Sequence, residues 1–235
     1  MIKHYPFDKL GKANHGWLKS SHHFSFANYY NPNRMGFGSL RVVNDDWVQE
    51  GKGFPPHPHS NMEIVSIIKT GAIVHQDSLG NKGVTHSGEI QVMSAGTGIV
   101  HSEYNLTKQP LTLYQIWIET NKIDVSPRWE SKKFTTAPSS DLPLLVSGYL
   151  EDKDKTLYIN QETRIYGGKI IKGVIIEHQI THQAYILASV GTFKVEDRDH
   201  SITLQKGDGA EIIESKMTVL TALTDCEIFI IDTCV

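Results

Sequence analysis

Residues 63–81, EIVSIIKTGAIVHQDSLGN, decide the fold class of this chain. The run Glu63 to Ile68 is rich in β-branched residues, Gly71 interrupts the pattern, and Ala72 to Asp77 resumes it before a polar turn. Short runs of this composition, separated by glycine-containing turns, are typical of β-strands. The sequence therefore predicts an all-β barrel or sandwich. Runs of the same kind follow at residues 89–93 and 111–118.

The strand pattern is lost between residues 119 and 143, a stretch interrupted by prolines. We interpret it as a connection with a short element near residues 128–134. Beyond it, Gly191-Thr192-Phe193 resembles Gly71-Ala72-Ile73, which favours two weakly similar β domains over a single larger sandwich. Two tandem jelly-roll β-barrels are predicted, at residues 1–125 and 126–235. Candidate strands of the second barrel are residues 169–177, 183–190, 191–195, 201–204, 210–214, 217–222 and 227–232.

The composition is that of an ordinary globular protein, with 39% hydrophobic residues, 21% charged residues and a formal net charge of -3. Without a basic patch, direct binding to nucleic acid is disfavoured. No signal-peptide core opens the chain, and no stretch approaches the roughly 20 apolar residues of a membrane span, so we expect no membrane association. Cys226 and Cys234 are too far apart along one expected strand to form a disulfide. We expect a reduced, cytoplasmic location.

Two short motifs carry the chemistry, His57-Pro58-His59 and His101-Ser102-Glu103. Residues i and i+2 of a strand point to the same face, so each motif directs two ligands the same way. If the two strands are neighbours inside a barrel, all four side chains converge on one point. Imidazole and carboxylate ligands suit a divalent transition metal. Four such ligands leave up to two octahedral positions for water, substrate or dioxygen.

Other polar residues receive structural interpretations. His75 and His86 lie in an expected hairpin, where we interpret them as solvent-facing or hydrogen-bonded. The stretch Asn44 to Asp46 has the composition of a turn rather than of a catalytic carboxylate pair. None of these residues is therefore assigned to the site.

The two motifs resemble the paired signatures of the cupin superfamily, and the sequence around them is closer still to the pirin family. The resemblance covers roughly residues 1–120. It implies a bicupin fold with one mononuclear metal site. It also implies quercetin 2,3-dioxygenase activity, as in several members, whereas the animal protein is linked with transcription-factor regulation. The matching segments are HHFSFANYY (22–30), MGFGSLRV (35–42), FPPHPH (54–59) and MSAGTGIVHSE (93–103).

The resemblance places the metal ligands at His57, His59, His101 and Glu103 of the first domain. Iron(II) is the expected metal, one ion per chain, and manganese, cobalt, nickel or zinc could occupy such a site. In the second domain His178 and His182 are four positions apart, and no His-x-Glu follows at the position of the second motif, so the spacing of metal ligands is lost. We therefore expect residues 1–125 to form the metal-binding cupin domain and residues 126–235 a degenerate cupin domain.

Two carboxylates compete for the fourth ligand position. Many cupins take their glutamate from the first motif, where Glu63 follows His59, whereas Glu103 is in phase with His101 as in pirins. We favour Glu103 as the ligand and Glu63 as a supporting residue outside the coordination sphere. An apolar pocket for a planar aromatic ligand is predicted, with ordinary core packing as the alternative for its residues. These are Phe24, Phe26, Phe54, Met93 and Trp117.

The favoured function is a metal-dependent dioxygenase that cleaves flavonols such as quercetin, with Glu103 as the candidate catalytic base. The expected partners are a small flavonol-like molecule and O2, and the chain is expected to act as a monomer. The alternative is a non-enzymatic iron-binding protein whose redox state controls docking to a transcription regulator or enzyme. A purely structural zinc site is disfavoured by the open coordination positions.

Overall fold

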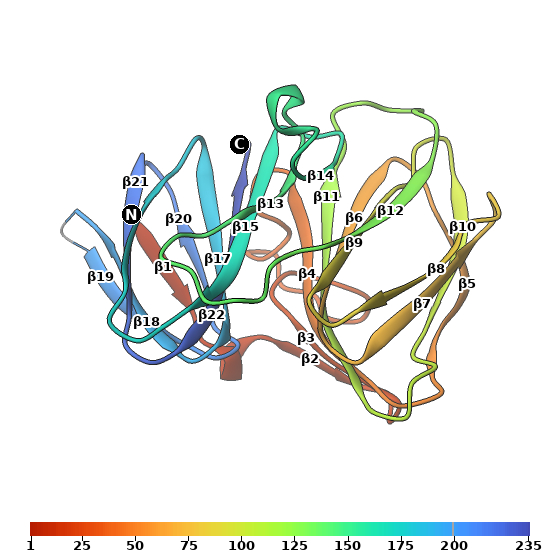
Figure 1. Ribbon diagram of the computed structural model, residues 1–235, viewed down its shortest axis with the longest axis horizontal. Helices are drawn as coiled ribbons and strands as arrows, with labels where there is room; N and C mark the ends of the chain where they lie inside the picture. Colours follow the sequence, from red (N-terminus) through yellow and green to blue (C-terminus); the bar gives the residue numbers. More distant parts are fainter. Residues whose placement is uncertain (199) are drawn as a thin grey trace. The chain divides into compact units, whose positions relative to one another are not determined.

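The computed structural model describes residues 1–198 and 200–235, and within them almost all regular structure is β-strand (Figure 1). The chain divides into two compact units. The N-terminal unit comprises Gly11–Phe134 and Leu157–Gln161, and the C-terminal unit comprises Met1–Leu10, Thr135–Thr156 and Glu162–Val235. Two short 3-10 helices, η1 (Phe7–Lys9) and η2 (Leu150–Asp152), lie in the C-terminal unit. The all-β fold class predicted from the sequence is confirmed.

The N-terminal unit contains a large and a small antiparallel sheet. Strand β14 (Leu157–Tyr158) also belongs to this unit. The large sheet has the order β12 (Arg128–Lys133), β9 (Glu89–Ser94), β6 (Met62–Thr70), β11 (Leu111–Glu119), β4 (Leu40–Val48), β3 (Leu18–His22) and β2 (Gly11–Asn14). The small sheet has the order β5 (Gly53–His59), β10 (Ile99–Tyr104), β7 (Ala72–Asp77) and β8 (Lys82–His86).

The C-terminal unit is built in the same way. Its large sheet runs in the order β1 (Ile2–Tyr5), β20 (Gly209–Ile212), β17 (Gln183–Val190), β22 (Cys226–Thr233), β15 (Thr163–Ile170) and β13 (Leu144–Ser147). Its small sheet runs in the order β16 (Ile175–Gln179), β21 (Met217–Ala222), β18 (Thr192–Asp197) and β19 (His200–Gln205). Each predicted strand run of this half coincides with one observed strand except the first. Residues 169–177 contain the end of β15 and the start of β16, separated by a turn at Gly173 (φ 88°).

The two compact units do not follow the predicted division at residue 125. Strand β1 pairs with β20, which places the first ten residues in the C-terminal unit. Strand β12 pairs with β9, which places residues 126–134 in the N-terminal unit. Hydrogen-bonded strand pairing decides which unit a segment joins, and a short strand carries no sequence sign of its partner.

The glycines that suggested an internal repeat have matching backbone conformations. Gly71 precedes β7 with φ 76°, and Gly191 precedes β18 with φ 75°. A Cβ atom would meet the Pro110 carbonyl oxygen at 3.0 Å in the first case and the Asp225 carbonyl oxygen at 2.2 Å in the second. Only glycine adopts this left-handed conformation readily and also tolerates such close backbone approach. The two positions are therefore equivalent corners of the two barrels.

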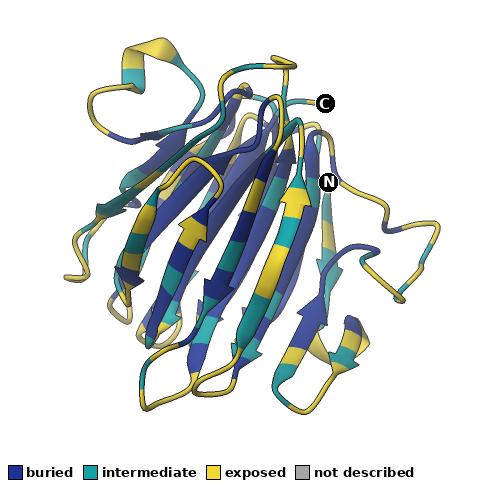
Figure 2. Cartoon of the chain, turned by 90° about the vertical axis from the view of Figure 1, so that its right-hand side faces the viewer, coloured by how far each residue is buried: buried dark blue, intermediate teal, exposed yellow. Residues whose placement is uncertain are grey.

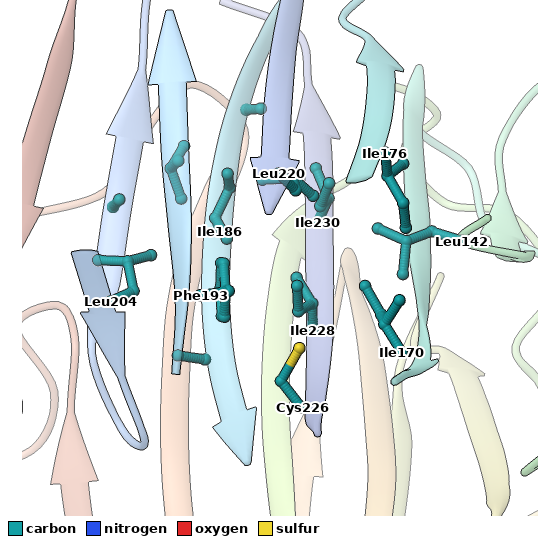
Figure 3. Packing of buried hydrophobic residues seen from close by; sticks show 14 of the residues in the cluster. Leu142, Ile170, Ile176, Ile186, Phe193, Leu204, Leu220, Cys226, Ile228 and Ile230 are labelled. Atoms are coloured by element: carbon teal, nitrogen blue, oxygen red, sulfur yellow. The ribbon is translucent and has the colours of Figure 1, made fainter. Parts of the chain in front are cut away.

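Alternation of buried and exposed residues along the strands separates the interior from solvent (Figure 2). Figure 3 shows the interior of the C-terminal unit, where one apolar cluster includes Phe193, Leu220, Ile228 and Ile230. Among the described residues, no helix is long and apolar enough to cross a membrane. In the N-terminal unit, apolar residues form separate clusters. One comprises Val48, Ile68, Ile73, Leu111 and Leu113, and another Ile64, Met93, Ala95 and Ile99.

Candidate metal centre

Three histidines of the two predicted motifs lie together on neighbouring strands of the small N-terminal sheet. His57 and His59 are on β5, and His101 lies opposite His57 on β10. The ring centroids are 4.4 Å apart for His57–His101, 5.0 Å for His59–His101 and 4.9 Å for His57–His59. One ring nitrogen from each residue lies within 4.8 Å of the others. This spacing allows the three imidazoles to bind one ion.

The hydrogen bonds of the ring nitrogens leave one nitrogen of His57 and one of His101 for a metal. His57 Nδ1 lies 2.7 Å from the Pro55 carbonyl oxygen, which can only accept, so Nδ1 carries a hydrogen and Nε2 is the nitrogen left to bind a metal. His101 Nε2 is buried and has no hydrogen-bond partner in the described part of the chain. Burial lowers the pKa of His101 to about 3 and that of His59 to about 4. Neutral imidazoles with unused lone pairs fit a divalent transition metal.

Glu103 lies one pleat further along β10, opposite His75 of β7. Its Oε1 accepts a hydrogen bond from Gln91 Nε2 (2.6 Å), and its Oε2 accepts one from Gln115 Nε2 (3.3 Å). Burial raises the pKa of this carboxyl to about 7, although the Gln91 hydrogen bond opposes the shift. Glu103 forms a second ligand group with His75 and His101, so His101 is common to both groups.

Glu63 lies outside both of these groups. It is 1% exposed and points into a different hydrogen-bond network. Its Oε2 accepts from Ser94 Oγ (2.7 Å), and its Oε1 accepts from Asn160 Nδ2 (3.1 Å). Glu63 belongs to β6, whereas His59 is the last residue of β5, so the even spacing of the two residues in the sequence does not direct their side chains to one point.

A cavity of about 290 Å³ opens beside the histidines. Three of the five predicted pocket residues, Phe26, Phe54 and Trp117, line it together with His57 and His59. The other two predicted pocket residues lie elsewhere. Phe24 is buried beneath the Arg34 guanidinium (4.3 Å from the ring centroid), and Met93 packs in the apolar cluster with Ile64, Ala95 and Ile99. Residue type alone does not reveal which aromatic and apolar side chains face the cavity.

Polar residues also line this cavity, and sequence reasoning assigned none of them to the site. They include Ser20, His22, Asn44, Asp46 and Gln115. Asn44 to Asp46 is part of β4, not the predicted turn, because it pairs with β11 on one side and β3 on the other. Asp46 is 3% exposed, and its Oδ1 has no hydrogen-bond partner in the described structure. Burial raises the pKa of Asp46 to about 7.

Two glutamines and a histidine of the site were also missed. Gln91 is oriented by Thr85 Oγ1, which donates to its Oε1 (2.9 Å), and Gln115 by Trp117 Nε1, which donates to its Oε1 (3.2 Å). Both amides are thereby turned with their NH2 groups toward Glu103. His75, interpreted from sequence as a hairpin residue, is fully buried beside His101. The i+2 phase of His75 with Asp77 was the available signal.

Each half of the chain matches a known protein family. Residues 5–118 match the family model described as Pirin, and residues 144–233 match that of the quercetinase C-terminal cupin domain. A pirin-like protein of Caulobacter vibrioides is 44% identical over 99% of both chains. A protein of Escherichia coli K12 named quercetin 2,3-dioxygenase is 40% identical over 96% of this chain and 95% of its own.

A solved structure agrees with these sequence matches. It is the bacterial pirin YhhW of Escherichia coli in complex with nickel(II), which is 38% identical, covers 100% of this chain and 99% of its own, and superposes with a TM-score of 0.92. High identity over nearly the whole length accompanies the same two-barrel architecture. The chain described here therefore belongs to the pirin family.

Proposed function

We propose that this chain is a metal-dependent dioxygenase that cleaves flavonols such as quercetin with O2. In this proposal His57, His59, His101 and Glu103 hold one divalent metal per chain, with iron(II) favoured and manganese, cobalt, nickel or zinc as substitutes. The observation that carries the proposal is the position of three imidazoles and a buried carboxylate beside an aromatic-lined cavity. The names of the quercetin 2,3-dioxygenase relatives support the same reaction class.

The cavity suits a planar, hydroxylated aromatic molecule. Phe26, Phe54 and Trp117 offer ring faces and edges for the apolar body of such a ligand. Asn44 and Asp46, which line the same cavity, offer acceptors and donors for its hydroxyl groups. A pocket with mostly apolar walls and a few polar groups fixes the orientation of a ligand as well as binding it.

The bound metal would supply positive charge that favours ionisation of a coordinated hydroxyl. The protein supplies the groups that receive the proton. Glu103 is the first candidate base, but both of its oxygens already accept amide hydrogen bonds. Asp46 Oδ1 has no hydrogen-bond partner among the described residues, so it is available to accept a proton. In the metal-free protein, burial raises the pKa of both carboxyls to about 7. Asp46 is not a proposed metal ligand, so it can take up a proton near neutral pH.

Oxygen uptake tests this proposal directly. Protein reconstituted anaerobically with iron(II) should consume dioxygen when quercetin is added, and a flavone without the 3-hydroxyl should be a poor substrate. Asp46→Asn keeps the shape of the side chain and removes the acceptor charge, so it should lower kcat by about 10²–10⁴-fold if Asp46 is the base. The same kcat measurement on metal-loaded Glu103→Gln tests Glu103 as the base independently of Asp46.

Absence of oxygen uptake by fully metallated, folded protein across several flavonols would overturn the dioxygenase proposal. The metal-dependent binding protein would then be the better hypothesis. Redox-dependent capture of a protein partner, with the His57→Ala variant as the negative control, would distinguish that hypothesis from an inactive enzyme.

A further inference from the structure

Behind His101 lies a buried pair that the proposed reaction does not use. His75 of β7 is 0% exposed, and its Nε2 lies 3.0 Å from Asp77 Oδ2. Its other nitrogen, Nδ1, lies 3.4 Å from His101 Nδ1. The ring stacks on Trp129, with centroids 4.9 Å apart and an interplanar angle of 9°. His75 is therefore fixed in position between a carboxylate and a candidate metal ligand.

The carboxylate end of this arrangement is rigid. Asp77 Oδ1 accepts from the main-chain N–H groups of Leu79 (2.9 Å) and Asn81 (3.0 Å), and Oδ2 also accepts from Asn81 Nδ2 (2.9 Å). Burial alone raises the pKa of Asp77, but the hydrogen bonds from His75, Asn81 and Leu79 leave it below its ordinary value. The turn after β7 thus holds an ionised carboxylate that can only accept hydrogen bonds.

The positions of the ring hydrogens follow from this geometry. Asp77 only accepts, so His75 Nε2 carries a hydrogen. A second hydrogen would make this ring, which is 0% exposed, a fully buried cation, so it is disfavoured. His75 Nδ1 then has a lone pair and needs a donor. The donor is His101 Nδ1, which leaves His101 Nε2 unprotonated. This is the same nitrogen that is buried without a partner in the described structure.

We infer that His75 and Asp77 are positioning residues that fix His101 in the tautomer whose Nε2 lone pair faces the metal site. This inference rests on the proposed role of His101 as a ligand. His57 obtains the same tautomer from the Pro55 carbonyl oxygen, but His101 obtains it from a side-chain pair. Such outer hydrogen bonds orient a ligating imidazole and raise its basicity.

Asp77→Asn is the sharpest test, because it should move the ring hydrogen of both His75 and His101 to the other ring nitrogen. The remaining side-chain oxygen can still accept from Leu79 and Asn81, while its NH2 group faces His75 Nε2. His75 must then accept at Nε2 and donate from Nδ1, so His101 carries its hydrogen on Nε2. In 15N-histidine-labelled, metal-free protein, NMR should find His101 protonated on Nδ1 in the wild type and on Nε2 in the variant. A wild-type Nε2–H, or the same tautomer in both proteins, would overturn the inference.

Metal affinity provides a second readout. Competition with a chelator for nickel(II) should show about 10–100-fold weaker binding for Asp77→Asn and for His75→Phe, which keeps a flat ring against Trp129. His75→Gln should recover part of the loss, since its amide can donate to Asp77 and accept from His101. His86→Phe, on the exposed side of β8, is the matched control and should bind nickel(II) as the wild type does.

The outcomes separate this inference from the proposed function. Wild-type nickel affinity in a folded His75→Phe protein would overturn the positioning role, whatever the enzyme activity. If His75→Phe fails to fold, the tautomer measured in Asp77→Asn still decides. A wild-type protein that has the Nδ1–H tautomer and binds nickel(II) but does not consume oxygen with flavonols would refute the dioxygenase proposal alone.

Discussion

The two units of this protein use one strand arrangement for two different interiors. Their small sheets have corresponding orders, β5-β10-β7-β8 and β16-β21-β18-β19. In the N-terminal unit His57 pairs with His101, and at the corresponding place in the C-terminal unit His178 pairs with Thr218. The buried His178 ring packs against Tyr166 at a centroid distance of 4.7 Å. Within the described residues, His178 belongs to no group of candidate metal ligands and packs against an aromatic ring, whereas three histidines at one point form a candidate metal site.

The difference extends through the barrel. Counting from Gly71 and Gly191, His75 corresponds to Val195, and the strand register then equates Glu103 with Leu220. In the large sheets the polar row Gln91–Ser66–Gln115 corresponds to an apolar row. Figure 3 shows part of that apolar interior. The members of the apolar row are Ala210, Ile186 and Ile230.

This comparison separates the requirements of the fold from those of the site. A filled apolar interior contributes to stability through burial, at roughly 25 cal/mol per Å² of apolar surface. The N-terminal unit replaces that burial with groups that must be hydrogen-bonded or ligated to be tolerated. Glu103 and Asp46 illustrate the cost, since burial raises the pKa of each to about 7. In this fold, a candidate metal site is therefore present in the unit whose interior contains polar residues in place of apolar ones.

The largest effect is expected when a metal ligand is exchanged for its C-terminal counterpart. His101→Thr should reduce the metal content from one ion per chain to background, because Thr offers no imidazole nitrogen. Metal analysis after reconstitution with nickel(II) and desalting measures this. His178→Ala, in the C-terminal unit, is the control and should retain a full complement of metal. A stoichiometric ion in folded His101→Thr would contradict the proposed ligand set.

The two buried glutamates should differ in the same assay. Glu103→Ala should weaken metal retention severely, because it removes the anionic ligand of the proposed site. Glu63→Ala breaks hydrogen bonds to Ser94 and Asn160 and should cost at most about 10–100-fold in affinity. The assignment is reversed if Glu63→Ala empties the site while Glu103→Ala remains loaded.

A core substitution in the C-terminal unit should affect stability without affecting the metal. Phe193 is 0% exposed within the apolar cluster, so Phe193→Ala should lower the free energy of unfolding by about 3–5 kcal/mol. Chemical denaturation followed by far-UV circular dichroism measures the loss, with exposed Lys206→Ala as the control. The folded variant should still bind one metal ion. A loss of metal at full stability would show that the two interiors are not independent.

The smallest expected effect is a pH dependence of the metal-free protein. The folded-state pKa of Glu103 is raised to about 7 from 4.5, so the folded state keeps this proton to higher pH than the unfolded chain does. The free energy of unfolding therefore falls as the pH rises between these values. The glutamine side chain of metal-free Glu103→Gln does not titrate. The melting temperature of the variant minus that of the wild type should therefore increase between pH 5 and pH 8. An unchanged difference at the two pH values would argue against a protonated Glu103 near neutrality.

Much of the fold followed from local pattern. β-Branched runs and glycine corners predicted the strands around Gly71 and Gly191, and the i, i+2 phase of His57 with His59 predicted their common face. The pairing of β1 with β20 was not predictable, because a four-residue strand has no distinguishing partner signal. The sequence predicts a turn at Asp46 because charged residues are uncommon in central strands, whereas the structure places it in β4 between two other strands.

The sequence by itself determined the all-β class, the family resemblance and the two histidine motifs, since each depends on residues close together in the chain. Only the tertiary structure decided which polar residues share an interior. Glu63 and Glu103 each stand an even number of residues after a motif histidine, but only Glu103 shares a strand with its histidine, and the hydrogen-bond partners of the two glutamates differ completely. His75 and Asp46 join the site through strand register, which brings together residues far apart in the sequence. Burial and register are properties of the assembled barrel, and they set the pKa values and tautomers on which the chemistry depends.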